Sequence, residues 1–323
     1  MISLNTESCI SFTEHRSGWK YCLDSLRPLQ SKGGIYVDGF IEKSFCWSLW
    51  DYHWARSFND IPYEREWIGF FHNPPNIPKW WDYMNSPEAV IERDVFKASL
   101  PSCKAIVVLS EYLKNYLQEK VDVPVISVKY ATDPAVPAWR PEYFLQNPEP
   151  QLIQIGYWLR KLNAIFEIKA PLPFRKAWLP SNVDYAKECR WRESTTKKNY
   201  YIKNYKDSTV WLREERLSNE EYDSYMTNNV VFLDMYDSSA NTTVIECIAR
   251  NTPLLVNRLP AVIEYCGEDY PLYFDSLEEA ADILTDTERI IAAHEHFKNM
   301  DKRWLRSSYF ASDLVEKLGE VWS

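Results

Sequence analysis

The chain has 323 residues, enough for one large domain or two medium-sized domains with their own cores. Its formal net charge of −9 disfavours a nonspecific grip on nucleic acid or on an anionic membrane as a property of the whole protein. Aromatic residues are abundant, with 14 tryptophans and 21 tyrosines, and they either fill cores or line a groove where sugars stack.

The cysteines and the N-terminal sequence bear on the cellular compartment. The seven cysteines are scattered and lack the paired spacing of a zinc site or of a disulfide framework, which favours a reducing compartment. The sequence MISLNTESCISFTEH lacks the basic-then-apolar shape of a secretory signal, and no apolar run approaches membrane-spanning length. We therefore expect a soluble, cytoplasmic protein, for which peripheral membrane contact stays open.

The first elements surround a glycine-containing turn. Met1 to Ile10 is a first strand or an irregular lead-in, and Trp19 to Leu26 has helical spacing. Between them stand Ser17 and Gly18, and a glycine at the start of a helix lets the backbone approach an anion closely. Ser17, Gly18 and Trp19 are therefore phosphate-binding candidates, although a tight turn without a ligand fits the same spacing.

Two strands with functional candidates follow. Gly34 to Gly39 reads as a strand, and the aromatic segment after it contains Glu42 and Asp51, which are conceivable catalytic bases. Trp67 to Phe71 is the clearest strand of this half, and it ends at His72 because the prolines that follow cannot continue a ladder. His72 therefore stands at the carboxyl end of a strand, where doubly wound sheets bind ligands, unless it is a structural histidine.

The rest of the first half predicts a parallel sheet. Trp80 and Trp81 form either an aromatic platform for an acceptor sugar or a packed loop. Ala105 to Leu109 reads as a strand, Tyr112 to Leu117 as a helix and Pro124 to Val128 as another strand. The order strand, helix, strand indicates parallel pairing. Prolines then cluster up to Pro150 and mark a domain boundary.

The second half opens with a strand and two cations. Leu152 to Ile155 is apolar and is followed by Gly156, Arg160 and Lys161. Apolar residues recur at helical spacing from Leu159 to Phe166, so the cations are expected at the start of a helix. A glycine turn with cations at a helix N-terminus suits an anion, and a pair of solvated charges is the alternative.

The most informative stretch runs from Val230 to Val256, VVFLDMYDSSANTTVIECIARNTPLLV. It reads as a strand, a polar loop, a helix and a second strand, which is one βαβ unit. Such a loop brings free backbone N–H groups and the positive end of a helix to one point, which suits a phosphate. Glu246 lies one turn into the helix, where its carboxylate can accept hydrogen bonds from ribose hydroxyls. The other candidates in this loop are Asp237, Ser238, Ala240, Asn241, Thr242 and Thr243.

This stretch resembles the donor-binding segment of retaining nucleotide-sugar glycosyltransferases with the GT-B fold, of the family 4-like or family 1 type. In that family two glutamates are separated by seven residues and are followed by a Gly-Thr-Pro turn. Glu246 matches the second glutamate, and Asn251-Thr252-Pro253 matches the turn. The first position falls on Ser238, which is not acidic, with Asp237 one residue out of register.

The resemblance implies an α/β protein with two Rossmann-like domains that face each other across a cleft. Residues 1–147 would form the acceptor domain, residues 148–300 the donor domain, and residues 301–323 a helix that packs back on the first domain. In such enzymes a histidine at the position of His72 touches the transferred sugar, and an arginine and a lysine, here Arg160 and Lys161, neutralise the donor diphosphate. Three junctions between a strand and a helix carry anion-binding candidates, at Ser17-Gly18, Arg160-Lys161 and Asn241-Thr242. If the two sheets face each other, these junctions converge on one cleft.

The expected function is transfer of a sugar from a UDP- or GDP-sugar to an acceptor hydroxyl, with a growing glycan as the expected acceptor and with retention of configuration. Helix N-termini together with Arg160 and Lys161 can stabilise the charge on the diphosphate, and no Asp-x-Asp pair stands where Mg²⁺ would be demanded, so neither a metal nor a cofactor is expected. Glu42, Trp80 and Trp81 are the candidates for binding the acceptor. The alternatives are a nucleotide-sugar epimerase on the same fold and a non-catalytic protein that binds nucleotides or sugars. No nucleic acid partner is expected, and the sequence does not determine the oligomeric state.

The role of Glu246 gives a first test. Replacing Glu246 by alanine should weaken nucleotide binding and leave the fold intact, because the side chain is expected to contact ribose. Isothermal titration with UDP and GDP, together with a thermal melt, measures both properties. Unchanged affinity would remove Glu246 from the site.

Overall fold

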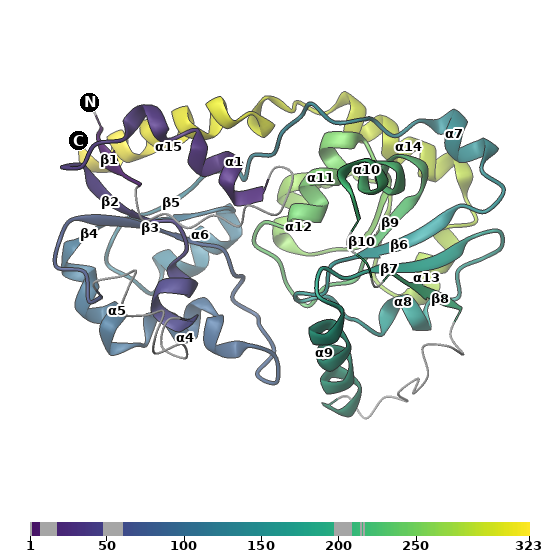
Figure 1. The fold of residues 1–323 in the computed structure, drawn as a ribbon, viewed down its shortest axis with the longest axis horizontal. Coiled ribbons are helices and arrows are strands. Elements are labelled where there is room, and N and C mark those ends of the chain that lie inside the picture. Colours follow the sequence, from purple (N-terminus) through teal and green to yellow (C-terminus); the bar gives the residue numbers. More distant parts are fainter. Residues whose placement is uncertain (1, 7–17, 48–60, 197–208, 214, 216) are drawn as a thin grey trace.

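The computed structural model describes residues 2–6, 18–47, 61–196, 209–213, 215 and 217–323. Within these ranges the chain forms two parallel β-sheets that lie side by side, each with its own helices (Figure 1). This arrangement confirms the expected α/β class with two facing halves.

The first sheet contains five parallel strands in chain order. They are β1 (Leu4–Asn5), β2 (Ile35–Asp38), β3 (Trp67–Phe71), β4 (Cys103–Val108) and β5 (Val125–Ser127). The α-helices of this half are α1 (Gly18–Asp24), α4 (Pro87–Ile91), α5 (Asp94–Ser99) and α6 (Glu111–Gln118). Strand β3 is buried along its whole length, as its continuous apolar sequence predicts.

The second sheet contains six parallel strands in the order β11-β10-β9-β6-β7-β8. They are β6 (Gln151–Ile155), β7 (Arg175–Leu179), β8 (Val210–Leu212), β9 (Val230–Leu233), β10 (Leu254–Asn257) and β11 (Tyr273–Phe274). The helices are α8 (Ala164–Glu167), α9 (Val183–Thr196), α10 (Asn219–Asn228), α11 (Thr242–Arg250), α12 (Pro260–Cys266), α13 (Leu277–Ile283) and α14 (Thr287–Asn299). From β6 the chain continues to β7 and β8 on one side of the sheet, and from β9 it continues to β10 and β11 on the other side. The strand order therefore reverses between β6 and β9.

The predicted βαβ unit is confirmed, and its ends follow from the sequence. Strand β9 and helix α11 occupy the apolar run and the helical pattern that the sequence shows. Asn241 caps the helix, since its side-chain oxygen accepts hydrogen bonds from the backbone of Thr243 and Val244. Asn251 ends it in the left-handed conformation, with φ of 58°, which asparagine tolerates better than most residues.

The helix predicted from Leu159 to Phe166 is wrong in its first half. Only α8, beginning at Ala164, is helical, because the backbone adopts positive φ values of 76° at Gly156 and 54° at Leu159. The segment instead pairs with the chain beyond β9: the backbone N–H of Lys161 donates to the carbonyl of Asp234. Arg160 and Lys161 therefore lie in a loop and not at a helix N-terminus.

No helix or strand is predicted between residues 169 and 216, where the structure has β7, α9 and β8. Helix α9 lacks an apolar stripe because part of its buried face is polar. Three polar residues on that face, Arg190, Glu193 and Ser194, are at most 2 % exposed. Glu193 accepts hydrogen bonds from the backbone and side chain of Asn163, at 2.9 Å each, which stabilises the buried carboxylate.

The chain crosses between the halves twice, and the crossings lie together. The first crossing leads from β5 to α7 (Pro141–Gln146), and the second leads from α14 back to α15 (Ser307–Trp322). The backbone N–H of Thr132 in the first crossing donates to the carbonyl of Leu305 in the second, at 3.0 Å. Helix α15 then packs against α1, and both chain ends lie on the side of the first sheet (Figure 1).

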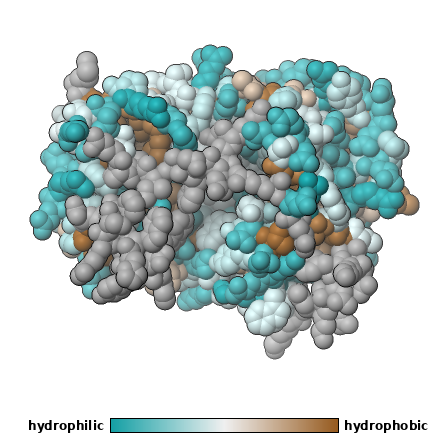
Figure 2. Space-filling view, viewed as in Figure 1, coloured by the Kyte–Doolittle hydropathy of each residue, from teal (hydrophilic) through white to brown (hydrophobic). Residues whose placement is uncertain are grey.

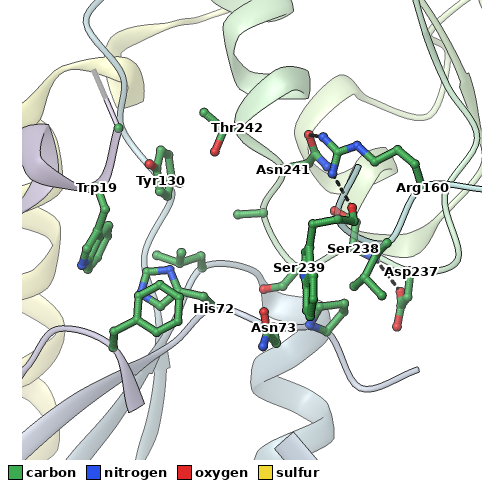
Figure 3. A pocket seen from close by; sticks show the side chains of 17 residues that line it. Trp19, His72, Asn73, Tyr130, Arg160, Asp237, Ser238, Ser239, Asn241 and Thr242 are labelled. Carbon is green, nitrogen blue, oxygen red and sulfur yellow. Dashed lines mark hydrogen bonds between the residues drawn. The ribbon is translucent and has the colours of Figure 1, made fainter. Parts of the chain in front are cut away.

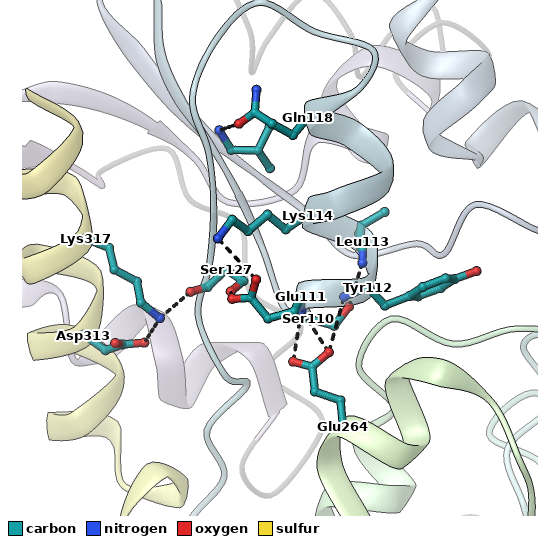
Figure 4. A network of polar contacts seen from close by, with 11 residues as sticks. Ser110, Glu111, Tyr112, Leu113, Lys114, Gln118, Ser127, Glu264, Asp313 and Lys317 are labelled. Carbon is teal, nitrogen blue, oxygen red and sulfur yellow. Dashed lines mark hydrogen bonds and ion pairs between the residues drawn. The ribbon is translucent and has the colours of Figure 1, made fainter.

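A carboxylate from the second half caps a helix of the first. Glu264 on α12 accepts hydrogen bonds from the backbone N–H groups of Glu111 and Tyr112, at 2.9 and 3.3 Å, at the start of α6 (Figure 4). Ser110 caps the same helix through its hydroxyl, at 3.3 Å from the N–H of Leu113. The positive end of α6 thus joins the two halves.

The surface in Figure 2 is mostly hydrophilic, with small separate groups of hydrophobic side chains. Among the described residues no helix is both long enough and apolar enough to cross a membrane. The six described cysteines are buried and unpaired.

Removing the cap that Glu264 provides should loosen the contact between the halves. Glu264→Ala leaves two backbone N–H groups without their acceptor, and hydrogen bonds to charged groups contribute about 1.5–3 kcal/mol. We expect the free energy of unfolding in urea to fall by about 1–3 kcal/mol. Glu268→Ala, which breaks an exposed pair with Arg258, is the control and should cost less than about 1 kcal/mol. Equal effects of the two variants would contradict the role of Glu264.

Candidate functional site

Two adjoining cavities open at the carboxyl ends of the strands. The smaller, of about 260 Å³, lies between the two halves, and the larger, of about 640 Å³, lies within the second half. Both are lined by Trp158, Arg160 and Thr242, so they meet at these residues. This meeting point lies beyond β6 and β9, where the strand order reverses and the loops diverge to leave a crevice.

The three predicted strand-to-helix junctions converge on the smaller cavity. Gly18 and Trp19 of α1 line it from the first half, and Arg160 and Thr242 line it from the second (Figure 3). The convergence expected from the sequence is thereby confirmed, whereas the ligand contacts assigned to these residues stay predictions. Ser17 lies outside the described residues.

Arg160 is the central cation of the site. Its guanidinium is only 8 % exposed and donates to the carbonyls of Ile155 and Trp158, at 3.2 and 2.6 Å. It also donates to side-chain oxygens of Asn241 and Thr243, at 3.3 and 3.2 Å. No carboxylate pairs with it within the described residues, and burial lowers its pKa to about 10. A buried positive charge held only by neutral acceptors is an incomplete arrangement that an anion would complete.

The backbone of the preceding loop brings this guanidinium into place. Gly156 has φ of 76°, and a Cβ there would lie 3.4 Å from the Nη2 atom of Arg160. Any larger residue would face both an unfavourable backbone conformation and the guanidinium. Gly156 also lines the larger cavity, and its contact with a donor stays a prediction.

The N-terminus of α11 faces both cavities. Asn241 and Thr242 line the smaller cavity, and Thr242 and Thr243 line the larger. Ala240, the residue before the cap, also lines the smaller cavity. Helix α11 therefore directs its positive end to the same point as Arg160, which strengthens the anion-binding character of the junction.

Lys161 does not share this position. Its ammonium lies 2.6 Å from a carboxylate oxygen of Asp234, and it lines neither cavity. Its charge is already neutralised, so the diphosphate role that we predicted for Lys161 is not supported by its position. The pair instead fastens the loop after β6 to the end of β9.

Asp237 joins the two halves. Its carboxylate accepts hydrogen bonds from the backbone of Asn76 at 2.9 Å and from the hydroxyl of Tyr112 at 3.0 Å, both in the first half. Its other oxygen accepts from the backbone of Ser238 at 2.8 Å. Asp237 and Ser238 line the smaller cavity, but the hydrogen bonds of this carboxylate are used within the protein. Ser239 adds a hydroxyl contact to Ser110 across the interface, at 3.2 Å.

His72 lines the smaller cavity as a neutral ring. Its Nε2–H donates to the carbonyl of Gly39 at 3.0 Å, and the ring stacks on Phe40 with centroids 4.1 Å apart. Trp19 packs against its edge at 4.6 Å. Burial lowers the pKa of His72 to about 4, so at neutral pH the imidazole is uncharged and a weak base.

Glu42 is a structural residue in this fold. It is completely buried and accepts hydrogen bonds from the backbone N–H groups of His72 and Asn73, at 2.7 and 2.6 Å. Burial raises its pKa to about 8. The position of Glu42 therefore does not support the prediction that it binds the acceptor, because its carboxyl group has no exposed surface. The carboxyl group instead holds the loop that carries His72. Asp51, the other acidic candidate, lies outside the described residues.

Trp80 and Trp81 pack between the two halves. Trp80 meets Tyr236 edge to face at 5.6 Å, and Trp81 meets Trp158 in the same way at 6.0 Å. Neither tryptophan lines either of these two cavities, so the acceptor platform stays a prediction without support from their position.

The larger cavity contains the residues that the sequence did not reveal. Its wall includes the ends of β7 and β8 and the start of α9, and its residues there are Leu179, Pro180, Ser181, Asn182, Val183, Asp184 and Arg213. Glu246 lines it opposite, 5 % exposed, together with Tyr222 of α10. These residues could have been predicted from the rule that the strands of a parallel sheet end at a common edge. That rule applies only once β7 and β8 are known, and the sequence analysis did not find these strands.

The described residues include no group of three or more histidine, cysteine, aspartate or glutamate side chains arranged to hold a metal ion. The absence of a metal from the reaction remains a prediction.

Comparison with solved structures identifies the fold as GT-B, although no family model and no curated protein sequence matches the chain. Sucrose-phosphate synthase from Thermosynechococcus elongatus has a TM-score of 0.61 at 16 % identity, over 89 % of this chain and 73 % of that one. A UDP-forming alpha,alpha-trehalose-phosphate synthase from Burkholderia xenovorans gives 0.57 at 12 % identity, over 95 % and 79 %. The corresponding UDP-forming enzyme from Burkholderia vietnamiensis gives 0.55 at 12 % identity, over 88 % and 74 %.

Because Arg160 lines the cavities and Lys161 does not, we expect their replacement to affect different properties: nucleotide affinity for Arg160 and stability for Lys161. Arg160→Ala should weaken the binding of a nucleoside diphosphate by about 10–100-fold, since hydrogen bonds from a charged donor contribute about 1.5–3 kcal/mol. Lys161→Ala should leave that affinity within about threefold and should lower the free energy of unfolding by about 1–3 kcal/mol, because it leaves the buried Asp234 without its cation.

Isothermal titration with UDP and GDP, and urea unfolding of both variants, separate the two effects. If the lysine variant lost as much affinity as the arginine variant, the assignment of the diphosphate site to Arg160 alone would be overturned.

Proposed function

We propose that this protein is a glycosyltransferase that moves a sugar from a nucleoside-diphosphate sugar, with UDP or GDP as the nucleotide, to an acceptor hydroxyl. The observation that carries the proposal is the buried guanidinium of Arg160, without a carboxylate partner among the described residues, at the junction of two cavities. A donor whose diphosphate lies at this junction would have its nucleoside in the larger cavity and its sugar in the smaller one.

The charges at the junction suit departure of the diphosphate. Arg160 and the N-terminus of α11 provide positive charge where the leaving group gains negative charge, which stabilises the transition state. This electrostatic help does not require a metal, and we propose a metal-independent reaction that uses no cofactor.

We further propose retention of configuration. In a front-face reaction the bond between the anomeric carbon and the diphosphate oxygen breaks while the acceptor oxygen bonds from the same side. The leaving phosphate oxygen takes the acceptor proton, so no enzyme base is needed. The state of two conceivable bases among the described residues supports this route, because Glu42 is buried and His72 is a weak base.

The acceptor is less well defined. We expected a growing glycan, but the names of the similar structures, sucrose-phosphate synthase and trehalose-phosphate synthase, point to a sugar phosphate. We therefore propose a sugar hydroxyl and treat a sugar phosphate and an oligosaccharide as the two acceptors to compare. A soluble, cytoplasmic location suits either one.

A donor panel tests the proposal. The protein is incubated with UDP-, GDP- and ADP-sugars, and slow release of the free nucleoside diphosphate should mark the cognate donor. Addition of hexose phosphates or short oligosaccharides should accelerate that release and give an α-linked product from an α-linked donor, as read by NMR. Arg160→Ala is the control and should abolish the release.

Two other outcomes would reject the proposal. Conversion of the donor into a new nucleotide sugar without an acceptor would identify an epimerase on the same fold. A shift in melting temperature with no turnover for any donor or acceptor would identify a non-catalytic binding protein.

A further inference from the structure

A tyrosine that the sequence analysis did not single out holds Glu246 in place. The hydroxyl of Tyr222 on α10 donates a short hydrogen bond to the Oε2 atom of Glu246 on α11. Both side chains line the larger cavity, and Glu246 is only 5 % exposed. The contact therefore lies in the wall of the cavity proposed for the nucleoside.

The direction of this hydrogen bond is fixed by the chemistry of the two groups. Burial, and then the charge of Glu246, raise the pKa of Tyr222 well above its usual value, so the phenol stays protonated and donates. Within the described residues no other hydrogen bond reaches the carboxylate of Glu246. Its second oxygen is therefore left as an acceptor beside the cavity.

The tyrosine is itself held between the two helices. Arg250 of α11 lies 5.7 Å from the centre of the Tyr222 ring. The same guanidinium pairs with Asp223, the neighbour of Tyr222 on α10, at 2.9 Å, and both partners of this pair are buried. The ion pair locks α10 to α11 and leaves the Tyr222 hydroxyl little freedom to move away from Glu246.

We propose that Tyr222 is a positioning residue that orients the carboxylate of Glu246 toward the ribose hydroxyls, so that the site selects ribonucleotide donors over deoxyribonucleotide donors. The inference rests on the proposed function and adds a specificity to it. A deoxyribose would leave the mostly buried Glu246 carboxylate without its hydroxyl partner, which is the situation in which a site rejects an analogue lacking one group.

The experiment measures the affinities of UDP, 2′-deoxy-UDP and 3′-deoxy-UDP, and of the corresponding guanosine compounds, by isothermal titration. The unmodified protein should bind at least one deoxy form about tenfold more weakly than its parent, since losing a charge-assisted hydrogen bond costs about 1.4 kcal/mol or more. In Tyr222→Phe the ratio of the two dissociation constants, deoxyribonucleotide to ribonucleotide, should fall at least about threefold, mainly because the ribonucleotide binds more weakly.

A matched control lies on the same helix. Tyr225→Phe also removes one hydroxyl from α10, but the ring of Tyr225 stacks on Trp211 and does not line the cavity. This variant should keep both the affinity and the ratio. Tyr222→His, which retains a donor on a ring, should keep more of the ratio than Tyr222→Phe, and it serves as the second variant if the phenylalanine variant is unstable.

The outcomes separate the inference from the proposed function. Equal binding of ribonucleotide and deoxyribonucleotide by the unmodified protein would overturn the inference alone, as would an unchanged ratio in Tyr222→Phe. Failure of the unmodified protein to bind any of these nucleotides would overturn both.

Discussion

The architecture of the site depends on one buried positive charge. The guanidinium of Arg160 is held by the carbonyls of its own loop and by Asn241 and Thr243 at the start of α11. These contacts tie the loop after β6 to the loop after β9, the two strands between which the sheet reverses its order. Among the described residues no carboxylate neutralises this charge, which is costly to bury unless an anion binds, and this is why we propose a phosphate site at this place.

The backbone around this charge is adapted to it. Positive φ values at Gly156 and Leu159 turn the chain back toward the sheet, and the loop pairs with residues that follow β9. A helix beginning at Arg160 would direct its side chains according to the helical period, and this loop instead places Arg160 inward and Lys161 toward Asp234. Two adjacent cations thereby acquire different surroundings and different roles.

Contacts between the halves lie at the position where the sequence departs from the resembled family. The position where the resembled family has its first glutamate is Ser238, and the neighbouring Asp237 bonds to Asn76 and Tyr112 of the first half. Glu264 caps α6 from the same side. Two carboxylates of the second half thus serve the interface, and Asp237 also lines the smaller cavity between the halves. The similar solved structures share this two-domain fold at 12–16 % identity, so the fold persists where few side chains are common.

The sequence alone determined the strands and the helix whose buried side chains are hydrophobic. Strands β3, β9 and β10 are continuous hydrophobic runs, and α11 has an apolar stripe with an asparagine at each end, so hydrophobic periodicity and capping were sufficient to find them. The parallel sheets followed, and so did the convergence of Gly18, Arg160 and Thr242. Arg160 and Thr242 come after neighbouring strands that end at one edge of the second sheet, and Gly18 comes after a strand of the first sheet, which was expected to face that edge.

Only the tertiary structure decided which polar groups are buried and with whom they pair. Helix α9 was missed because part of its buried face is polar, and the hydrogen bonds of Glu42, Lys161 and Asp237 could not be foreseen because their partners are distant in the sequence. Tyr222 and Glu246 stand on different helices and meet only when α10 packs against α11. Hydrophobic burial leaves a periodic signal along the chain, whereas the pairing of a buried charge depends on a partner that the folded chain alone brings near.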